Sequence, residues 1–100
     1  MDMRGQEYDE APRPVKMPPV EYPAQAKTDS VEGLVILTVT IDTKGTVTAV
    51  SVYQSVREDM DRAVMDAWRQ SVWKPAKLKG EPVEVTVNFP VRFKLKKAEK

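Results

Sequence analysis

Carboxylates are the side chains of this sequence whose type and spacing could do chemistry, and they gather in one predicted helix. They are Glu58, Asp59, Asp61 and Asp66. Acid–base catalysis by a carboxylate pair needs one group in an apolar pocket that raises its pKa. The pattern instead places these acids at water-facing positions or in the first helical turn. The sequence therefore predicts a protein that is not an enzyme.

Missing residue types exclude most other chemical sites. The sequence contains no cysteine and no histidine, which removes thiol nucleophiles, Ser–His pairs and Cys/His zinc sites. Its glycines are few and scattered, so no phosphate-binding loop is predicted. Asp42-Thr43 lacks the spacing of a calcium-binding EF-hand loop. We expect no cofactor and no metal ion.

Length and charge narrow the remaining classes to a small binding domain. One hundred residues form at most one domain with a small core. A net charge of +1 is unlike the basic stripe of nucleic-acid binders, so no nucleic-acid partner is expected. No apolar run reaches the length of a membrane span or a signal-peptide core. An anchor of the natural protein would lie upstream of this sequence.

The two ends of the chain carry no periodic apolar pattern. Residues 1–21 include prolines at positions 12, 14, 18 and 19, which favours extended or disordered chain. We interpret them as the end of a proline-rich linker, with a cloning leader as the alternative for the first few residues only. Residues 96–100 form a basic tail, interpreted as solvated. The folded domain is expected to span residues 22–95.

Short periodic elements fill the first half of this domain. Pro23 starts a helix of about one to two turns that ends near residues 28–30. Residues 34–41 alternate as in a strand rich in β-branched side chains, and residues 42–45 predict a tight hairpin loop. The return strand covers residues 46–53, with a bulge near Thr48–Ala49 because the period of two breaks there.

A longer helix and a long strand fill the second half. Ser55 and Glu58 match a capping box, and Pro75 ends the helix around Val72. Its buried stripe comprises Met60, Ala63, Val64, Ala67, Trp68 and, less regularly, Ser71. The odd-numbered residues from Val83 to Leu95 are apolar and the even-numbered ones are mostly polar, which predicts a strand with one core face. Trp68 and Trp73 are expected in the core.

These elements predict an α+β fold. We expect a three-stranded antiparallel sheet made of the hairpin and the long C-terminal strand. The short N-terminal helix and the longer helix pack on one face of it.

An ordered string of residues carries a family resemblance. It comprises Tyr22-Pro23, Ala26, Glu32-Gly33, Ile41-Asp42, Gly45, Val47, Val50, Val52, Ser55, Asp61, Ala63, Trp73-Lys74-Pro75-Ala76, Gly80, Pro82-Val83, Pro90-Val91 and Phe93. Taken together, this string resembles the TonB C-terminal domain family. One departure is Ser71, where similar proteins carry an aromatic; Trp68, one helical turn earlier, is expected to fill that volume.

The resemblance implies a role that composition does not show. TonB proteins are anchored in the inner membrane and cross the periplasm through a proline-rich linker. They bind the TonB box, a short extended segment of outer-membrane receptors, and so couple an inner-membrane proton-driven motor to nutrient import. This implies a periplasmic domain tethered by an upstream anchor. Its partners would be TonB-dependent receptors and, through the N-terminal part, the motor complex.

In the family the receptor segment adds as a strand beside the last long strand. Pro90 has no N–H and is tolerated only where its nitrogen faces away from the ladder, so it marks the open edge. The predicted partner-binding residues on this strand are Glu84, Val85, Thr86, Val87, Asn88, Phe89 and Arg92. The resemblance adds a second contact, immediately before the first helix, at Pro19, Val20, Glu21 and Tyr22.

Alternatives stay open for several of these residues. Pro90 could serve only to protect the edge from aggregation, and Tyr22 could be a staple that packs on the core. The same fold could be a TolA-like interaction domain of another cell-envelope protein. It could also form a homodimer through the open edge of the long strand.

Overall fold

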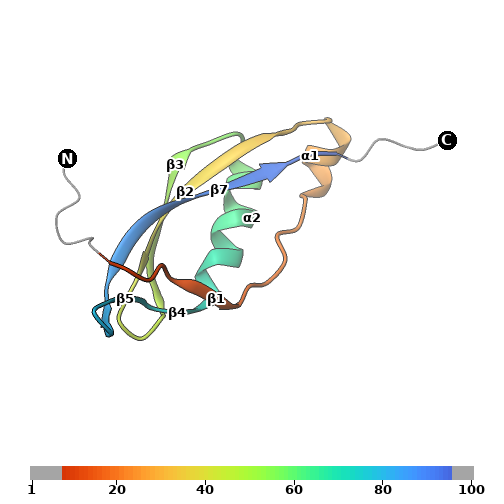
Figure 1. The fold of residues 1–100 in the computed structure, drawn as a ribbon. Coiled ribbons are helices and arrows are strands. Elements are labelled where there is room, and N and C mark those ends of the chain that lie inside the picture. Colours follow the sequence, from red (N-terminus) through yellow and green to blue (C-terminus); the bar gives the residue numbers. More distant parts are fainter. Residues whose placement is uncertain (1–7, 96–100) are drawn as a thin grey trace.

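The computed structural model describes residues 8–95 (Figure 1). Its elements are β1 (Arg13–Lys16), α1 (Ala24–Thr28), β2 (Gly33–Ile41), β3 (Val47–Gln54), α2 (Glu58–Arg69), β4 (Val72–Lys74), β5 (Ala76–Leu78), β6 (Glu81–Val83) and β7 (Val85–Phe93). The predicted α+β fold is confirmed, because an antiparallel sheet of order β3-β2-β7 is accompanied by two helices. Figure 1 shows α2 lying across one face of this sheet.

The central strand β2 supplies most of the core. Every second residue from Val35 to Ile41 is apolar and fully buried beneath α2. Burial of each such side chain contributes about 1.5–3 kcal/mol. The core also contains Val85 and Phe93 from the two ends of β7, so the sheet is held along its whole length.

The β2–β3 hairpin is closed by Asp42 and Gly45. The Asp42 carboxylate accepts the backbone N–H groups of Lys44 and Thr46, both at 2.9 Å. Gly45 has φ +84°, and a Cβ there would lie 1.8 Å from the carbonyl oxygen of Trp73. The turn therefore requires glycine both for its left-handed backbone and for its close approach to β4.

Strand β3 carries two irregularities. The register passes from Thr40–Ala49 to Ile41–Val47, so Thr48 is the extra residue and the predicted bulge is confirmed. A second shift between Ile36–Gln54 and Leu37–Val52 leaves Tyr53 unmatched. Bulges bend a strand and increase its local twist, so the outer edge of β3 is not a straight ladder.

The capping box predicted at Ser55 is wrong. Helix α2 starts at Glu58, and its N-cap Arg57 is extended with no side-chain cap bond. The chain stays extended here because Val56 packs directly on Gly33, where a Cβ would lie 2.7 Å from a Val56 methyl group. Ser55 instead donates a hydrogen bond to the buried carboxylate of Asp61.

Asp61 lies in the first turn of α2, as predicted, but its carboxylate does not face water. It is only 9% exposed, and it also accepts the backbone N–H of Val56 at 3.1 Å. It fixes the connection between β3 and α2.

The buried face of α2 is largely as predicted, with Met60, Val64 and Ala67 in the core. The helix ends at Arg69, earlier than predicted, because Val72 already belongs to β4.

The aromatic cluster joins α2, β4 and β7. Trp73 is 6% exposed, its ring lies 5.1 Å from that of Phe89, and the half-buried Trp68 lies 6.0 Å from Phe89. Buried Ser71 accepts the indole N–H of Trp73 at 2.7 Å. A small polar residue at position 71 therefore supplies the hydrogen-bond partner of a buried indole.

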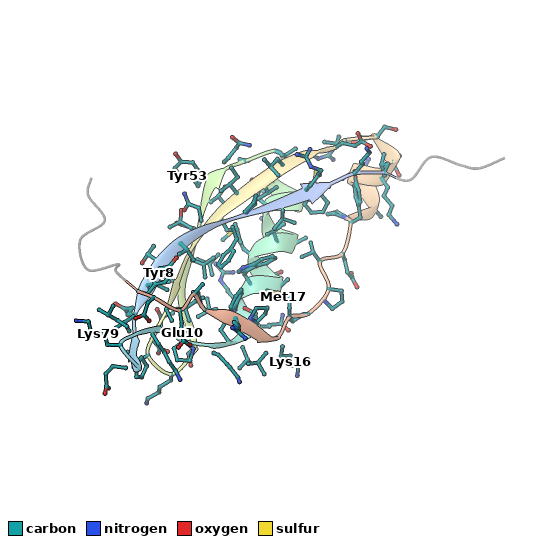
Figure 2. All side chains as sticks on the ribbon, viewed as in Figure 1. Tyr8, Glu10, Lys16, Met17, Tyr53 and Lys79 are labelled. Carbon is teal, nitrogen blue, oxygen red and sulfur yellow. The ribbon has the colours of Figure 1, made fainter. Side chains whose placement is uncertain are left out.

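The segment before α1 docks on the domain through β1, and this docking was not predicted from the sequence. β1 pairs antiparallel with β4, and Glu10 exchanges backbone hydrogen bonds with Lys77 at 3.0 and 3.1 Å. All of β1 is exposed, so its docking rests on main-chain bonds at the rim (Figure 2). Residues 1–7 of the expected linker and the basic tail at 96–100 lie outside the described residues.

Candidate functional site

The candidate site is the outer edge of β7. Its nine residues pair with β2 from Ile41–Val85 to Gly33–Phe93 without any shift in register. Within residues 8–95, β7 has no second strand on its other side. A long edge without bulges presents a regular row of backbone donors and acceptors.

Pro90 defines which backbone groups face outward. It lies opposite Ile36 in the middle of the unshifted ladder. A proline fits there only where its nitrogen faces away from the neighbouring strand. Orientation alternates along a strand, so the outward groups belong to Pro90 and its even-numbered neighbours, among them Asn88 and Arg92.

The start of the predicted strand needs correction. β7 begins at Val85, whereas Val83 belongs to β6 and pairs with Ala76 of β5. The hairpin turns at Lys79 and Gly80, both with positive φ, and it occupies the chain up to Val83. Glu84 therefore lies between two strands and is not part of the β7 edge.

The remaining predicted residues of the strand lie on β7. Val85 is buried, and Val87 and Phe89 are partly buried against the core. On the opposite face, the hydroxyl of Thr38 donates to Asn88 Oδ1 at 2.7 Å, and the hydroxyls of Thr40 and Thr86 lie 2.9 Å apart. These cross-strand bonds hold β7 in register with β2, and no sequence pattern indicated them.

The strand ends beside a pocket. A hollow of about 390 Å³ is lined by Glu32, Gly33, Arg92, Phe93 and Lys94. The exposed Arg92 side chain thus has open space next to it at the C-terminal end of the edge.

The second predicted contact is divided between two places. Tyr22 packs edge-on against Phe93, with ring centroids 5.1 Å apart, and its hydroxyl donates to the carbonyl of Val31. Partial burial raises the pKa of the Tyr22 phenol, and the Glu32 carboxylate raises it further. This is the geometry of a staple, which holds the incoming chain at the end of β7.

The residues before Tyr22 lie elsewhere. Pro19 and Glu21 are exposed, and together with Ala63, Asp66 and Gln70 of the α2 region they line an open hollow of about 420 Å³. Val20 packs against the core. The structure therefore brings Tyr22 to β7 but turns Pro19 and Glu21 toward α2.

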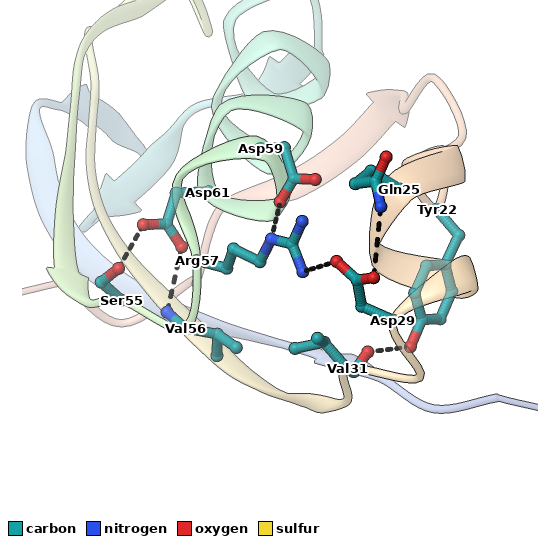
Figure 3. A network of polar contacts seen from close by, with 9 residues as sticks. All are labelled: Tyr22, Gln25, Asp29, Val31, Ser55, Val56, Arg57, Asp59 and Asp61. Carbon is teal, nitrogen blue, oxygen red and sulfur yellow. Dashed lines mark hydrogen bonds and ion pairs between the residues drawn. The ribbon is translucent and has the colours of Figure 1, made fainter.

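A polar network positions α1, and with it Tyr22 (Figure 3). The Arg57 guanidinium contacts Asp29 at 2.9 Å and Asp59 at 3.2 Å, and so joins the start of α2 to the end of α1. Gln25 also donates to Asp29, at 3.2 Å. The hydrogen bond from Arg57, followed by that from Gln25, lowers the pKa of the Asp29 carboxyl.

Two further observations concern residues 8–95 as a whole. None of their helices is long and apolar enough to cross a membrane. Their Asp and Glu side chains form no group of three that could hold a metal ion.

Comparison with known proteins agrees with this architecture. Residues 18–95 match the family described as Gram-negative bacterial TonB protein C-terminal. Protein TonB from two strains of Xanthomonas campestris pv. campestris is 42% identical over 80 residues, which is 79% of this chain and 36% of each relative. The chain thus spans only about a third of the length of the curated relatives it matches.

A solved structure shares the fold. The solution NMR structure of the Pseudomonas aeruginosa TonB C-terminal domain superposes with a TM-score of 0.76 and 28% sequence identity. The match covers 99% of this chain and 100% of that one. With the match over residues 18–95, this chain belongs to the TonB C-terminal domain family.

Proposed function

We propose that the outer edge of β7 binds an extended peptide segment, the TonB box of an outer-membrane transporter, by strand addition. The guest strand would run along residues 85–89. In this mode main-chain hydrogen bonds supply affinity and alternate side chains supply specificity.

One observation carries this proposal: within residues 8–95, β7 is an edge strand with an unbroken register. Its cross-strand side-chain bonds at Asn88 and Thr86 hold the strand in register with β2 before any guest arrives. A preorganised edge lowers the ordering cost of association on the side of the protein.

The expected affinity is modest. Residues 85–89 include two with outward backbone groups, Thr86 and Asn88, so about four main-chain bonds are expected. At a net value of about 1 kcal/mol each, and with the peptide's ordering cost to offset, these bonds cannot by themselves reach the roughly 8 kcal/mol of a micromolar Kd. Side-chain contacts of the guest would have to supply at least about half of that affinity. Pro90 interrupts the row of outward donors, so residues beyond it would contribute little.

An amide NMR titration with a synthetic TonB-box peptide tests the site. Saturable shifts are expected on residues 85–89 and near Tyr22. Asn88→Pro removes one outward N–H but leaves the ladder to β2 intact, so it should weaken binding at least about tenfold. Asn88→Ala is the matched control, because it loses the same side-chain bond to Thr38 but keeps the N–H.

Two results would overturn the proposal. One is the absence of shifts up to millimolar peptide in a folded, monomeric sample. The other is equal binding by the proline and alanine variants, which would show that the outward N–H takes no part.

The wider role follows from the family and forms part of the same proposal. The whole protein would be a periplasmic energy transducer, tethered to the inner membrane. It would couple a proton-driven motor to transport through outer-membrane receptors, including iron uptake.

The same edge also supports a second candidate, self-association of two copies through β7. Sedimentation as a function of protein concentration separates the two roles. A dimer that Asn88→Pro disrupts, and that peptide does not displace, would favour assembly over receptor binding.

A further inference from the structure

A basic face lies at the end of the molecule away from α1 (Figure 1). It is built on the β1–β4 ribbon and the neighbouring hairpin turn. Its members are Arg13, Lys16, Lys44 and Lys74, together with the apolar residues Val15 and Val72. All of them are exposed, and Figure 2 shows Lys16 on the side of β1 that faces away from α2.

Main-chain contacts bring these residues together. Arg13 lies directly opposite Lys74 across the ribbon, and Lys16 lies opposite Val72. The hairpin turn joins the other side of β4, since the N–H of Trp73 donates to the carbonyl of Gly45 at 3.0 Å. Lys44 precedes that glycine. Residues from three separate parts of the chain therefore form one surface.

The four cations on this face have no ion-pair partner among residues 8–95. Like charges directly opposite each other across a ladder are destabilising, and the Arg13–Lys74 pair has this arrangement. No carboxylate of residues 8–95 forms an ion pair with any of the four cations, whereas Arg57, Arg62 and Arg69 near or on α2 all have acidic partners. Asp42, the acid nearest Lys44 in sequence, accepts two backbone N–H groups of its own turn.

The face also exposes apolar side chains among its cations. Val15 is 61% exposed and Val72 is 46% exposed. The shift in register between Pro14 and Lys16 leaves Val15 as the extra residue of a bulge, beside Lys16 and opposite Val72. Packing within the fold does not explain why these valines are at the surface.

From this combination we infer that the basic face docks on an anionic phospholipid surface. Lysines next to exposed aliphatic groups suit such a surface, because the ammonium groups attract lipid phosphates while the apolar groups enter the headgroup layer. A carboxylate-bearing protein partner would favour the rigid fork of arginine, whereas three of the four cations are lysines with mobile point charges. Bound phosphates would also relieve the repulsion between Arg13 and Lys74.

Vesicle co-sedimentation of the full chain tests this inference. Vesicles with about 30% phosphatidylglycerol in phosphatidylcholine should bind the protein at about 0.05 M salt, and pure phosphatidylcholine vesicles should not. Binding should fall steeply toward 1 M salt, where charges are screened within about 3 Å. Each cation next to the surface contributes about fivefold in partitioning, so K16E/K74E should bind at least about 25-fold more weakly.

The matched control is K27E/K94E. It makes the same change in net charge at exposed lysines outside the basic face. It should retain most of the binding, and far-UV circular dichroism should show that both double variants are folded. Val15→Ser should weaken binding without altering its salt dependence.

Several outcomes would overturn the inference. They are equal binding to both vesicle types, or an equal loss in K16E/K74E and K27E/K94E. Inorganic phosphate that displaces the protein more than chloride of the same ionic strength would indicate a discrete anion site instead of surface docking. Saturable binding to polyglutamate in the absence of vesicle binding would point to an acidic protein partner.

Discussion

The two outer edges of the three-stranded sheet differ in ways that bear on function. The β3 edge has two register shifts, at Thr48 and Tyr53, and is met near one end by a bridge from Thr46 to Val72. The β7 edge runs over nine residues without a shift. Bulges and coverage are the devices by which proteins protect an edge from unwanted pairing. Among residues 8–95 the bulges and the bridge lie on the β3 side, and the β7 edge carries one proline.

This difference indicates that, within residues 8–95, the sheet protects its β3 edge against pairing and leaves its β7 edge suitable for a further strand. The side chains agree, because bonds from Asn88 and Thr86 hold β7 in register with β2, while Tyr53 on β3 is 68% exposed. A guest strand could therefore form a regular ladder with β7 but not with β3.

The largest expected effect comes from a proline with its nitrogen on the inner side of β7. Val87 lies opposite Val39, and its N–H faces inward if Pro90 faces outward. Val87→Pro should cost more than about 3 kcal/mol, whereas Asn88→Pro should cost about 1 kcal/mol, mainly its bond to Thr38. Urea unfolding measures both. Similar losses for the two variants would show that the assignment of inner and outer groups is wrong.

A second prediction concerns Gly45, in the turn that joins β2 to the edge strand β3. Gly45→Ala should cost about 3 kcal/mol, because the new methyl group would collide with the Trp73 carbonyl in addition to the strain of a positive φ. Gly80 has nearly the same φ, +83°, but open space around its Cβ position. Gly80→Ala should therefore cost only about 1 kcal/mol. The difference between their urea midpoints isolates the contact of the turn with β4.

The other end of β3 depends on Asp61. Asp61→Ala should destabilise the fold by about 2 kcal/mol, because the partly buried Val56 N–H and the Ser55 hydroxyl lose their acceptor. Asp66→Ala on the same helix removes only an exposed contact to Arg69 at 3.6 Å and should cost less than about 0.5 kcal/mol. Urea unfolding of the two variants measures this difference. Equal unfolding midpoints would contradict a structural role of Asp61.

The smallest effect concerns Asp29, which helps to place Tyr22 at the end of β7. Because Arg57 lowers the pKa of this carboxyl below its usual value of 3.8, its contribution to stability is present above that pH. The contribution is lost as pH falls through the lowered folded-state value. Asp29→Asn should therefore lower the thermal midpoint slightly at pH 7 and not at all near pH 2. If the difference in thermal midpoint between the parent protein and Asp29→Asn grew as the pH was lowered, the prediction would be contradicted.

The sequence analysis succeeded where burial imposes a period. β2 and β7 each have one face against the core, so alternation revealed both strands, and the bulge at Thr48 appeared as a break in that alternation. The edge of β7 followed from Pro90 in the same way. These features depend on residues close together in the chain.

Contacts between distant residues escaped prediction. β1, β4, β5 and β6 are too short to show a period, and each depends on a partner elsewhere or on the turn at Lys79 and Gly80. Ser55 matched a capping box, but Val56 must pack on Gly33, so the helix starts later. Glu84 was predicted to lie on the long strand because the apolar–polar alternation already starts at Val83. The structure places Val83 in the β5–β6 hairpin, so the alternation spans two separate strands.

The docking of residues 8–16 along the rim has a mechanical consequence. β1 buries no side chain, so a pull on the N-terminal side of the chain would peel this segment before it strained any core contact. Residues 8–19 would then be released, each spanning at most about 3.4 Å, until the load reached Val20 and Tyr22, which pack against the core. From there, contacts with Val31 and Phe93 would transmit the force along the axis of the β2–β7 ladder, whose perpendicular bonds would resist it together. In force spectroscopy the segment before α1 should extend at low force, and the sheet should then resist unfolding until a higher force is reached.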